Sequence, residues 1–278
     1  MTLGIIAAVI ILFIIYVLWD NQKLDTTHYS IKIPYISESL KGIKLLQISD
    51  PHIRNNRADF QKLIEEAKEA KPDLIVLTGD LVQAGLEDFP AEAVTKLAES
   101  LTAIAPTYAV TGNHDFSYTG NQRWQLALLN GGAQLLLDKA EWIPVKDSGL
   151  VLMGLAEKGD MKQTSRPLLQ HIELPPALEK FPKILLAHHP EFFEEYLDDR
   201  TKAPDLVLAG HTHGGQVRLP FIGGLFSPGQ GLFPKYDYGY FYRDSEPARR
   251  LIINRGIGNS TFPFRVFNRP EIVVITLQ

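Results

Sequence analysis

Five apolar segments of this chain end in Asp, Asn or His side chains, and this recurrence restricts the fold more than any other feature. Each segment has the length and composition of a buried β-strand. In open α/β sheets, ligands bind just beyond the carboxyl ends of the strands. We therefore expect these side chains to converge on one polar site. The segments and the polar residues that follow them are LLQIS with Asp50 and His52, LIVLTG with Asp80, YAVTG with Asn113, His114 and Asp115, KILLA with His188 and His189, and DLVLAG with His211 and His213.

Asp50 and His52 are separated only by Pro51. Side chains two positions apart in a β-strand point to the same side of the sheet. If the extended geometry continues to residue 52, both side chains face one ligand. Pro51 fixes its own φ near −65° and disfavours helix at Asp50, so it is compatible with an extended or turning segment.

The strands alternate with segments of helical spacing over residues 57–70 and 90–101, and further strands follow at 149–157, 183–190, 205–213, 250–256 and 271–277. Alternating strands and helices are typical of a layered α/β domain. We expect one such domain over residues 25–278.

Charge and composition exclude several classes of protein and of site. The net charge is −4 and there is no run of Lys or Arg, so we expect no nucleic-acid partner. The chain has no Cys, which excludes disulfides and thiolate metal sites. A metal ion bound here must therefore take nitrogen and oxygen ligands.

Residues 3–19 form an apolar segment without a charge or a proline. As a helix, these 17 residues would span roughly 25 Å, the short end of what crosses a bilayer. We predict an N-terminal transmembrane anchor over residues 1–24. A cleaved signal peptide is an alternative, although no small-x-small cleavage site follows, and a buried soluble helix is another. Lys23 and Lys32 follow the segment, which favours a cytoplasmic domain on a strict count.

The five motifs SDPH, LTGDL, TGNHD, LAHHP and AGHTHGG, taken in order, resemble the signature of calcineurin-like metallophosphoesterases. The resemblance implies a four-layer αββα sandwich in which two mixed sheets face each other between helices. It also implies roles for the motif residues. Two metal ions would be held, the first by Asp50, His52 and His213 and the second by Asn113, His188 and His211, with Asp80 bridging them. His114 would face the phosphate, with Asp115 orienting it. His189 falls outside the motif, and we interpret it as a residue behind the ligands or at the surface.

These residue types suit hydrolysis of a phosphoester for general reasons. Two divalent cations about 3.5–4 Å apart can share a hydroxide that attacks phosphorus in line, and they can stabilise a phosphoryl oxygen. A neighbouring imidazole can stabilise the developing charge or protonate the leaving oxygen. Imidazole, carboxylate and amide ligands suit Mn, Fe or Zn, and the choice among them stays open.

The segment GDLVQAG has no Arg after its Asp, unlike the phosphoprotein phosphatases of this superfamily. The later segments GHTHGGQVRLP, GLFPKYDYGYF and NRGIGNSTFPFRVFNRPEI resemble the membrane-associated YkuE/YaeI-type group. That resemblance implies a phosphodiesterase or pyrophosphatase acting on a lipid-linked, cell-wall or nucleotide-sugar phosphoester. A phosphomonoesterase of the same fold and a non-catalytic phosphate-binding module are the alternatives.

The resemblance also favours the outer face of the cell membrane for the domain, against the lysine count, since large domains cross largely regardless of charge. We expect a monomer. Aromatic residues are frequent over residues 221–267, where they form a substrate wall, a membrane-facing rim, or simply loop packing.

Overall fold

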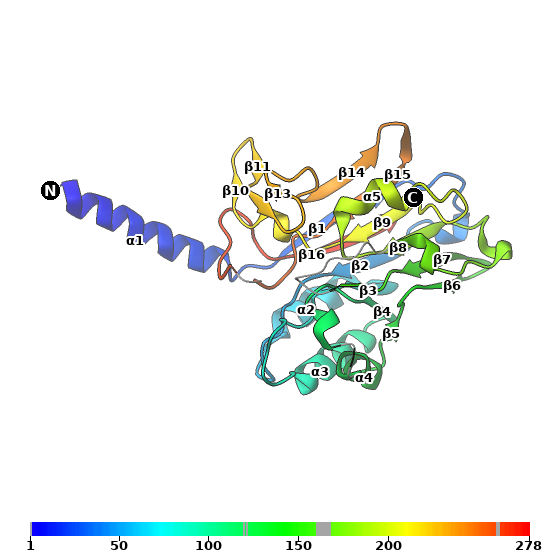
Figure 1. Cartoon of the computed structure of the whole chain (residues 1–278), viewed down its shortest axis with the longest axis horizontal. Coiled ribbons are helices and arrows are strands. Elements are labelled where there is room, and N and C mark those ends of the chain that lie inside the picture. Colours follow the sequence, from blue (N-terminus) through cyan, green and yellow to red (C-terminus); the bar gives the residue numbers. More distant parts are fainter. Residues whose placement is uncertain (1, 119, 121, 160–167, 260–261) are drawn as a thin grey trace.

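The computed structural model describes residues 2–118, 120, 122–159, 168–259 and 262–278, and it contains two six-stranded sheets packed face to face (Figure 1). Both sheets mix parallel and antiparallel pairs. The first sheet has the strand order β1 (Asp25–Ile31), β16 (Glu271–Leu277), β2 (Lys44–Ile48), β3 (Leu74–Thr78), β4 (Thr107–Val110) and β5 (Gln134–Leu135). The second sheet has the order β14 (Gly239–Arg243), β15 (Glu246–Ile253), β9 (Leu206–Ala209), β8 (Lys183–Leu186), β7 (Ser148–Gly154) and β6 (Lys139–Val145).

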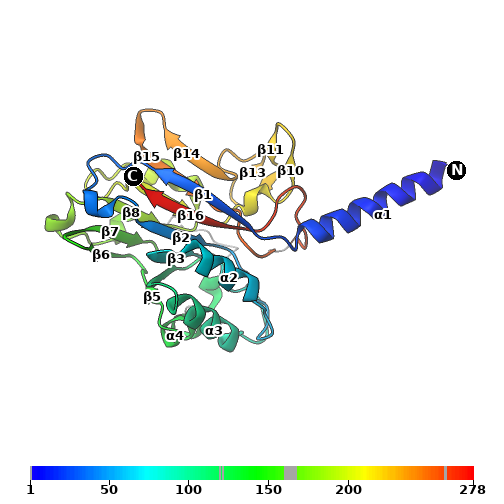
Figure 2. The same cartoon turned by 180° about the vertical axis from the view of Figure 1, so that it is seen from behind.

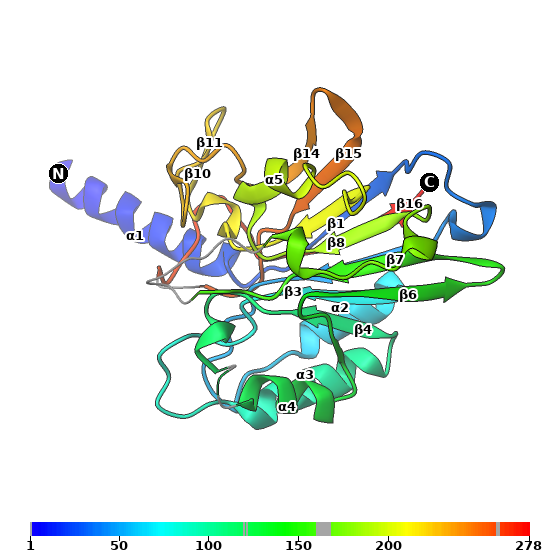
Figure 3. The ribbon, with the colours of Figure 1, turned by 45° about the vertical axis from the view of Figure 1, so that its right-hand side comes forward.

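Helices cover the outer face of the first sheet much more fully than that of the second, and Figure 3 shows this arrangement. On the first sheet lie α2 (Gln61–Ala70), α3 (Ala91–Thr102) and α4 (Arg123–Asn130). On the second sheet lies the one-turn helix α5 (Phe193–Tyr196), with short 3₁₀ helices at Leu169–His171 and Pro190–Phe192. The predicted α/β sandwich of two mixed sheets is confirmed.

The remaining elements are short. Two small hairpins pair β10 (Arg218–Leu219) with β11 (Gly223–Gly224) and β12 (Phe226–Ser227) with β13 (Gly231–Leu232). Further 3₁₀ helices lie at Glu38–Leu40, Asp115–Tyr118, Pro176–Leu178 and His213–Gly215.

The continuous apolar runs of the sequence are explained by burial on both faces of each sheet. In β3, Val76 points between the sheets while Ile75 and Leu77 point toward the helices. Alternate side chains of a strand point to opposite faces, so a strand covered on both sides is apolar throughout.

The carboxyl ends of β2, β3 and β4 lie at one edge because these strands run parallel, and the parallel pair β8 and β9 ends beside them. A buried glutamine, Gln47, joins the two sheets there. Its side-chain amide donates to Thr78 Oγ1 over 3.1 Å in the first sheet and to the Ala209 carbonyl over 2.9 Å in the second. The polar residues after all five strands are thereby brought to the same place.

The N-terminal helix α1 (Thr2–Asp20) projects from the sandwich (Figures 1 and 2). Within the described residues, no helix combines the length and the apolar composition needed to cross a membrane. The transmembrane helix predicted over residues 1–24 is therefore not found among the described residues.

The end of α1 is fixed to the loop that follows Arg255. Phe267 lies against the rings of Phe13 and Tyr16, with centroids 6.3 and 6.1 Å apart. The side chain of Asn21 accepts from the Arg265 amide over 2.7 Å and donates to the Arg265 carbonyl over 2.7 Å. Two-way pairing of this kind fixes the direction in which the helix leaves the domain.

Leu152 of β7 is fully buried between the two sheets. Leu152→Ala should lower the free energy of unfolding by about 2–5 kcal/mol, because it removes buried methyl groups and leaves a cavity. Leu126 on α4 is half exposed, and Leu126→Ala is the matched control, with an expected change within about 0.5 kcal/mol. Urea unfolding followed by circular dichroism measures both. Equal effects of the two substitutions would contradict this assignment of the core.

Candidate metal centre

All seven predicted ligands meet at the edge where the five strands end, and every one of them is buried. Asp50 and His52 follow β2, Asp80 follows β3 and Asn113 follows β4, while His188 follows β8 and His211 and His213 follow β9. The convergence expected from the strand pattern is therefore present in the structure.

The backbone at the ligands departs from the extended geometry assumed for Asp50 and His52. Strand β2 ends at Ile48, and φ is +52° at Asp50 and +47° at His52. The left-handed region is uncommon for residues with a side chain and costs of order 1–3 kcal/mol per residue. The same region is adopted at Asp80, His211 and His213, with φ of +53°, +70° and +48°. Tight turns, and not strand alternation, direct these side chains inward.

The first group of ligands is Asp50, His52 and His213. The Nε2 atoms of the two histidines face each other over 3.1 Å, and Asp50 Oδ1 lies 3.5 Å from His213 Nε2. Ring nitrogens and a carboxylate oxygen thus point at one spot, as ligands of a shared cation do.

The second group contains His188, His211 and Asn113. His188 Nε2 lies 3.2 Å from His211 Nδ1, and Asn113 Oδ1 is buried without a hydrogen-bond partner among the described residues. Asp80 lies between the groups, because its Oδ2 is 3.2 Å from His188 Nε2 and 3.6 Å from His52 Nε2. One oxygen within reach of both groups is the arrangement expected of a bridging ligand.

The charges of these residues suit divalent ions. Burial lowers the pKa of His211 and of His213 well below the usual value, so both imidazoles are neutral, the form that binds metal. Burial raises the pKa of Asp80, but the facing His188 outweighs it and holds that pKa well below its usual range. Burial lowers the pKa of His188, but the facing Asp80 outweighs burial and raises that pKa to about 10, so this imidazole is protonated without a metal ion, and a cation bound there would take the place of the proton. The residues present therefore fit two metal ions with nitrogen and oxygen ligands.

Supporting contacts fix the ligand orientations, and sequence reasoning missed the residues that make them. Ser49 Oγ donates to Asp50 Oδ2, and His188 Nδ1 lies 2.8 Å from the Thr78 carbonyl. A bond from the second ring nitrogen to a carbonyl leaves the first nitrogen for metal. Arg265 Nη2 lies 3.2 Å from His213 Nδ1. Gln47, a polar residue within an apolar run, is the kind of sequence signal that could have indicated such support.

His114 lies beside the ligands with its Nε2 atom 4.0 Å from Asp80 Oδ2. Its Nδ1 accepts from the Ala84 amide over 3.1 Å and lies 3.2 Å from Gln83 Nε2. Burial lowers its pKa, so the ring is neutral and carries its proton on Nε2, toward the metal centre.

Asp115, which was predicted to orient His114, bonds to the backbone. Its carboxylate accepts from the amides of Leu81, Val82 and Gly112 over 3.2, 2.9 and 3.0 Å. Asp115 therefore holds together the turns that carry Asp80 and Asn113, and Gln83 and Ala84 contact the ring of His114.

His189 is buried behind the second group, which excludes the surface position considered for it. Its Nε2 lies 2.6 Å from Glu157 Oε2 and its Nδ1 lies 3.0 Å from Glu191 Oε1. Burial lowers its pKa, but these two carboxylates outweigh burial and raise that pKa to about 9.

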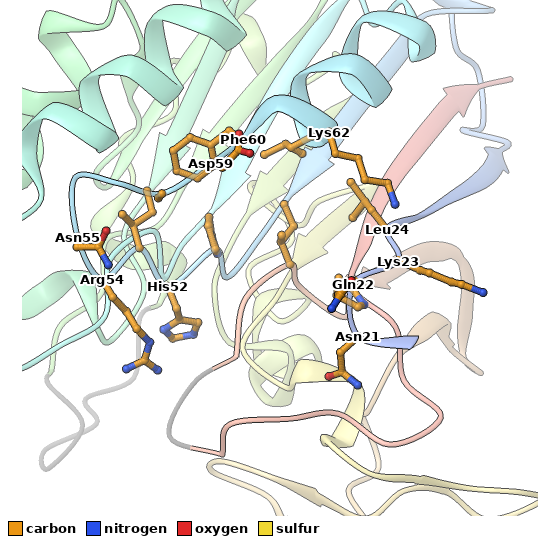
Figure 4. A pocket seen from close by; sticks show the side chains of 16 residues that line it. Asn21, Gln22, Lys23, Leu24, His52, Arg54, Asn55, Asp59, Phe60 and Lys62 are labelled. Atoms are coloured by element: carbon orange, nitrogen blue, oxygen red, sulfur yellow. The ribbon is translucent and has the colours of Figure 1, made fainter. Parts of the chain in front are cut away.

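A cleft of about 430 Å³ opens above the ligands. Its floor is formed by the metal centre and its walls by aromatic and small residues, of which Phe192, Phe226, Phe262, Pro228 and Gly229 are examples. Two aromatics of the 221–267 region thus line the cleft, whereas Phe221 and Phe233 are exposed elsewhere. A second pocket of about 400 Å³ lies beside His52, between the residues after α1 and the start of α2 (Figure 4).

Comparison with known proteins agrees with this geometry. Residues 43–215 match the model of the calcineurin-like phosphoesterase family. The chain is 30% identical to the metallophosphoesterase YkuE of Bacillus subtilis (strain 168) over 93% of this chain and 87% of that protein. It is 30% identical to the phosphodiesterase YaeI of Escherichia coli (strain K12) over 88% of this chain and 86% of that protein. A crystal structure of TT1561 of Thermus thermophilus resembles it with a TM-score of 0.48 at 15% identity, covering 77% of this chain and 90% of that one.

The ligand set is complete, the family model covers more than half of the chain, and both relatives match along most of it. The chain therefore belongs to the calcineurin-like phosphoesterase family and is a metal-dependent phosphoester hydrolase.

Proposed function

We propose that this protein hydrolyses phosphodiester or pyrophosphate bonds of a lipid-linked, cell-wall or nucleotide-sugar phosphoester. The observation that carries the proposal is the position of Asp80 Oδ2 between His52 and His188, which joins two ligand groups into one dinuclear centre. Mn, Fe or Zn ions, when bound, supply Lewis acidity and lower the pKa of a water molecule.

The residues of the chain have distinct tasks in this reaction. Asp80 contacts imidazoles of both ligand groups and keeps the two groups side by side. His114 presents Nε2–H toward the same space, where it can donate to a phosphoryl oxygen or to the leaving oxygen. The name of the relative YaeI, a phosphodiesterase, supports a diester, and so does a cleft that extends beyond the ligands along aromatic walls.

We also propose that α1 attaches the domain to the outer face of the cell membrane. The support is a helix that projects from the domain (Figure 2) and exposes apolar side chains along its length. Tyr16 and Trp19 lie near its end, where aromatic residues favour a membrane interface. A phosphoester at the membrane surface would then be within reach of the cleft. Protease protection on intact cells tests the side of the membrane.

Asp80→Asn should lower kcat/KM for bis-p-nitrophenyl phosphate at least about 100-fold and reduce the bound metal, because a neutral amide cannot bridge two cations as a carboxylate does. The Mn-loaded protein is assayed and its metal content is measured by mass spectrometry. Asp147 is exposed, and Asp147→Asn is the control, with unchanged activity. An Asp80→Asn protein with normal turnover would refute the proposed function, and a higher rate on monoesters would make the enzyme a phosphomonoesterase.

His114→Ala should lower kcat by about 10²- to 10⁴-fold, the usual contribution of a positioned proton donor. Metal content should stay at the wild-type value, since the contacts of His114 place it beside the ligands. Steady-state kinetics and metal analysis on the same sample check this. Loss of a metal ion from the variant would instead show that His114 is a ligand.

Substituting Asp for Ile10 and Ile14, which are both exposed on α1, should abolish co-sedimentation of the full chain with phospholipid vesicles. Burying two carboxylates in the apolar layer is unfavourable. Tyr35→Asp is the control because Tyr35 is exposed outside α1, and this variant should still bind. Undiminished vesicle binding by the double variant would contradict attachment through α1.

A further inference from the structure

Glu191 lines the cleft beside the second ligand group and has an unused hydrogen-bond acceptor. Its Oε1 receives the bond from His189, whereas its Oε2 is buried without a partner among the described residues. A carboxylate oxygen can only accept hydrogen bonds, and a buried one left unpaired is unfavourable. The orphaned oxygen therefore points to a ligand that carries a donor.

The carboxylate is held in place from two sides. His189 is itself fixed by Glu157 on its other nitrogen, and the Tyr196 hydroxyl donates to the His189 carbonyl over 3.0 Å. Gly229 has φ of +73°, and a β-carbon there would lie 2.6 Å from Glu191 Oε1. The positive φ would strain any residue other than glycine here, so the loop packs closely against the carboxylate, and the side chain of Glu191 is 15% exposed. An acceptor held this firmly is preorganised for binding.

Glu191 lies close to the ligands that would hold the reacting phosphoryl group. One carboxylate oxygen of Glu191 and one ring nitrogen each of His189 and His211 all lie within 4.8 Å of one another. Since His211 belongs to the second ligand group, the Glu191 carboxylate lies next to that group. Phe226 and Phe262, which are about half exposed, form an apolar wall of the same cleft. A substituent bound here would be attached directly to the phosphorus atom. It would make one polar contact, with Glu191, and would pack one apolar face on the aromatic wall.

We propose that Glu191 and the aromatic wall form a subsite for a hydroxylated ring, as in a sugar, attached to the phosphorus of the substrate. The hydroxyl donates to Glu191 Oε2, and the apolar face of the ring packs on Phe226 and Phe262. The negative charge of Glu191 also disfavours a second phosphate or a carboxylate at this position. The subsite rests on the proposed diesterase function and narrows its substrate class.

A matched pair of diesters tests the subsite. Cyclohexyl p-nitrophenyl phosphate and trans-4-hydroxycyclohexyl p-nitrophenyl phosphate differ by one hydroxyl, which is too far from phosphorus to attack it. In both, water adds to phosphorus and p-nitrophenolate leaves. The wild-type protein should hydrolyse the hydroxylated ester with a kcat/KM roughly 10-fold higher, the effect of one hydrogen bond to a charged acceptor.

Glu191→Leu keeps the apolar bulk and removes the acceptor, so it should bring the ratio of the two kcat/KM values to about 1. The ratio is measured on one sample, and a change in metal occupancy cancels from it. Asp198 follows the same short helix in the sequence and is exposed, and Asp198→Asn should retain the wild-type ratio. If Glu191→Leu does not fold, Glu191→Gln should still lower the ratio, because an uncharged group binds the hydroxyl more weakly.

A wild-type ratio near 1, or a ratio unchanged in the Glu191 variants, overturns the subsite while leaving the diesterase intact. Loss of bound metal in Glu191→Leu also overturns it, since Glu191 would then be a metal ligand. If the wild-type protein hydrolyses neither ester, the proposed function fails. In that case, the binding of cyclohexyl and trans-4-hydroxycyclohexyl methylphosphonate is measured by calorimetry. The subsite requires that the hydroxylated compound bind more tightly, and equal binding overturns it.

Discussion

The contact of the Asp80 carboxylate with imidazoles on both of its sides is the interaction on which the rest of the site depends. Asp80 follows a strand of the first sheet and His188 a strand of the second, so their 3.2 Å contact joins the two halves of the sandwich. The five other ligands, the bond from Gln47 between the sheets and the turn held by Asp115 all surround this pair. The fold is thus organised around a buried polar centre that an apolar sandwich would otherwise avoid.

Much of this centre could be predicted from the sequence because chemistry and strand pattern coincide there. Each ligand follows an apolar run, and the parallel arrangement of the runs makes their ends meet. The left-handed turns at Asp50 and His52 could not be predicted, since they depend on what packs behind them. The backbones of Gly256 and Gly258 lie so close to Asp50 and Pro51 that a β-carbon at either would clash. No local pattern near residue 50 reports those distant glycines.

The residues that position another side chain are the ones that could not be identified from the sequence. Asp115 is part of the GNHD motif, and it accepts from backbone amides, while Gln83, outside the motif, contacts the ring of His114. Glu191 and Arg265 belong to no motif, and only the folded chain brings one beside His189 and the other beside His213. The apolar composition of residues 3–19 predicted a helix correctly, but the extent of that helix depends on where it meets the domain.

The position of β16 has a consequence for biosynthesis. This strand is formed by residues 271–277, and it lies between β1 and β2, two strands from the opposite end of the chain. During translation, β1 has no partner strand in the sheet until residues 271–277 have left the ribosome. The Ser49–Asp50 turn likewise lacks its backbone bonds from Ile257 and Gly258 until those two residues have been made. Every ligand of the centre has thus been synthesised before the turn that carries Asp50 is complete.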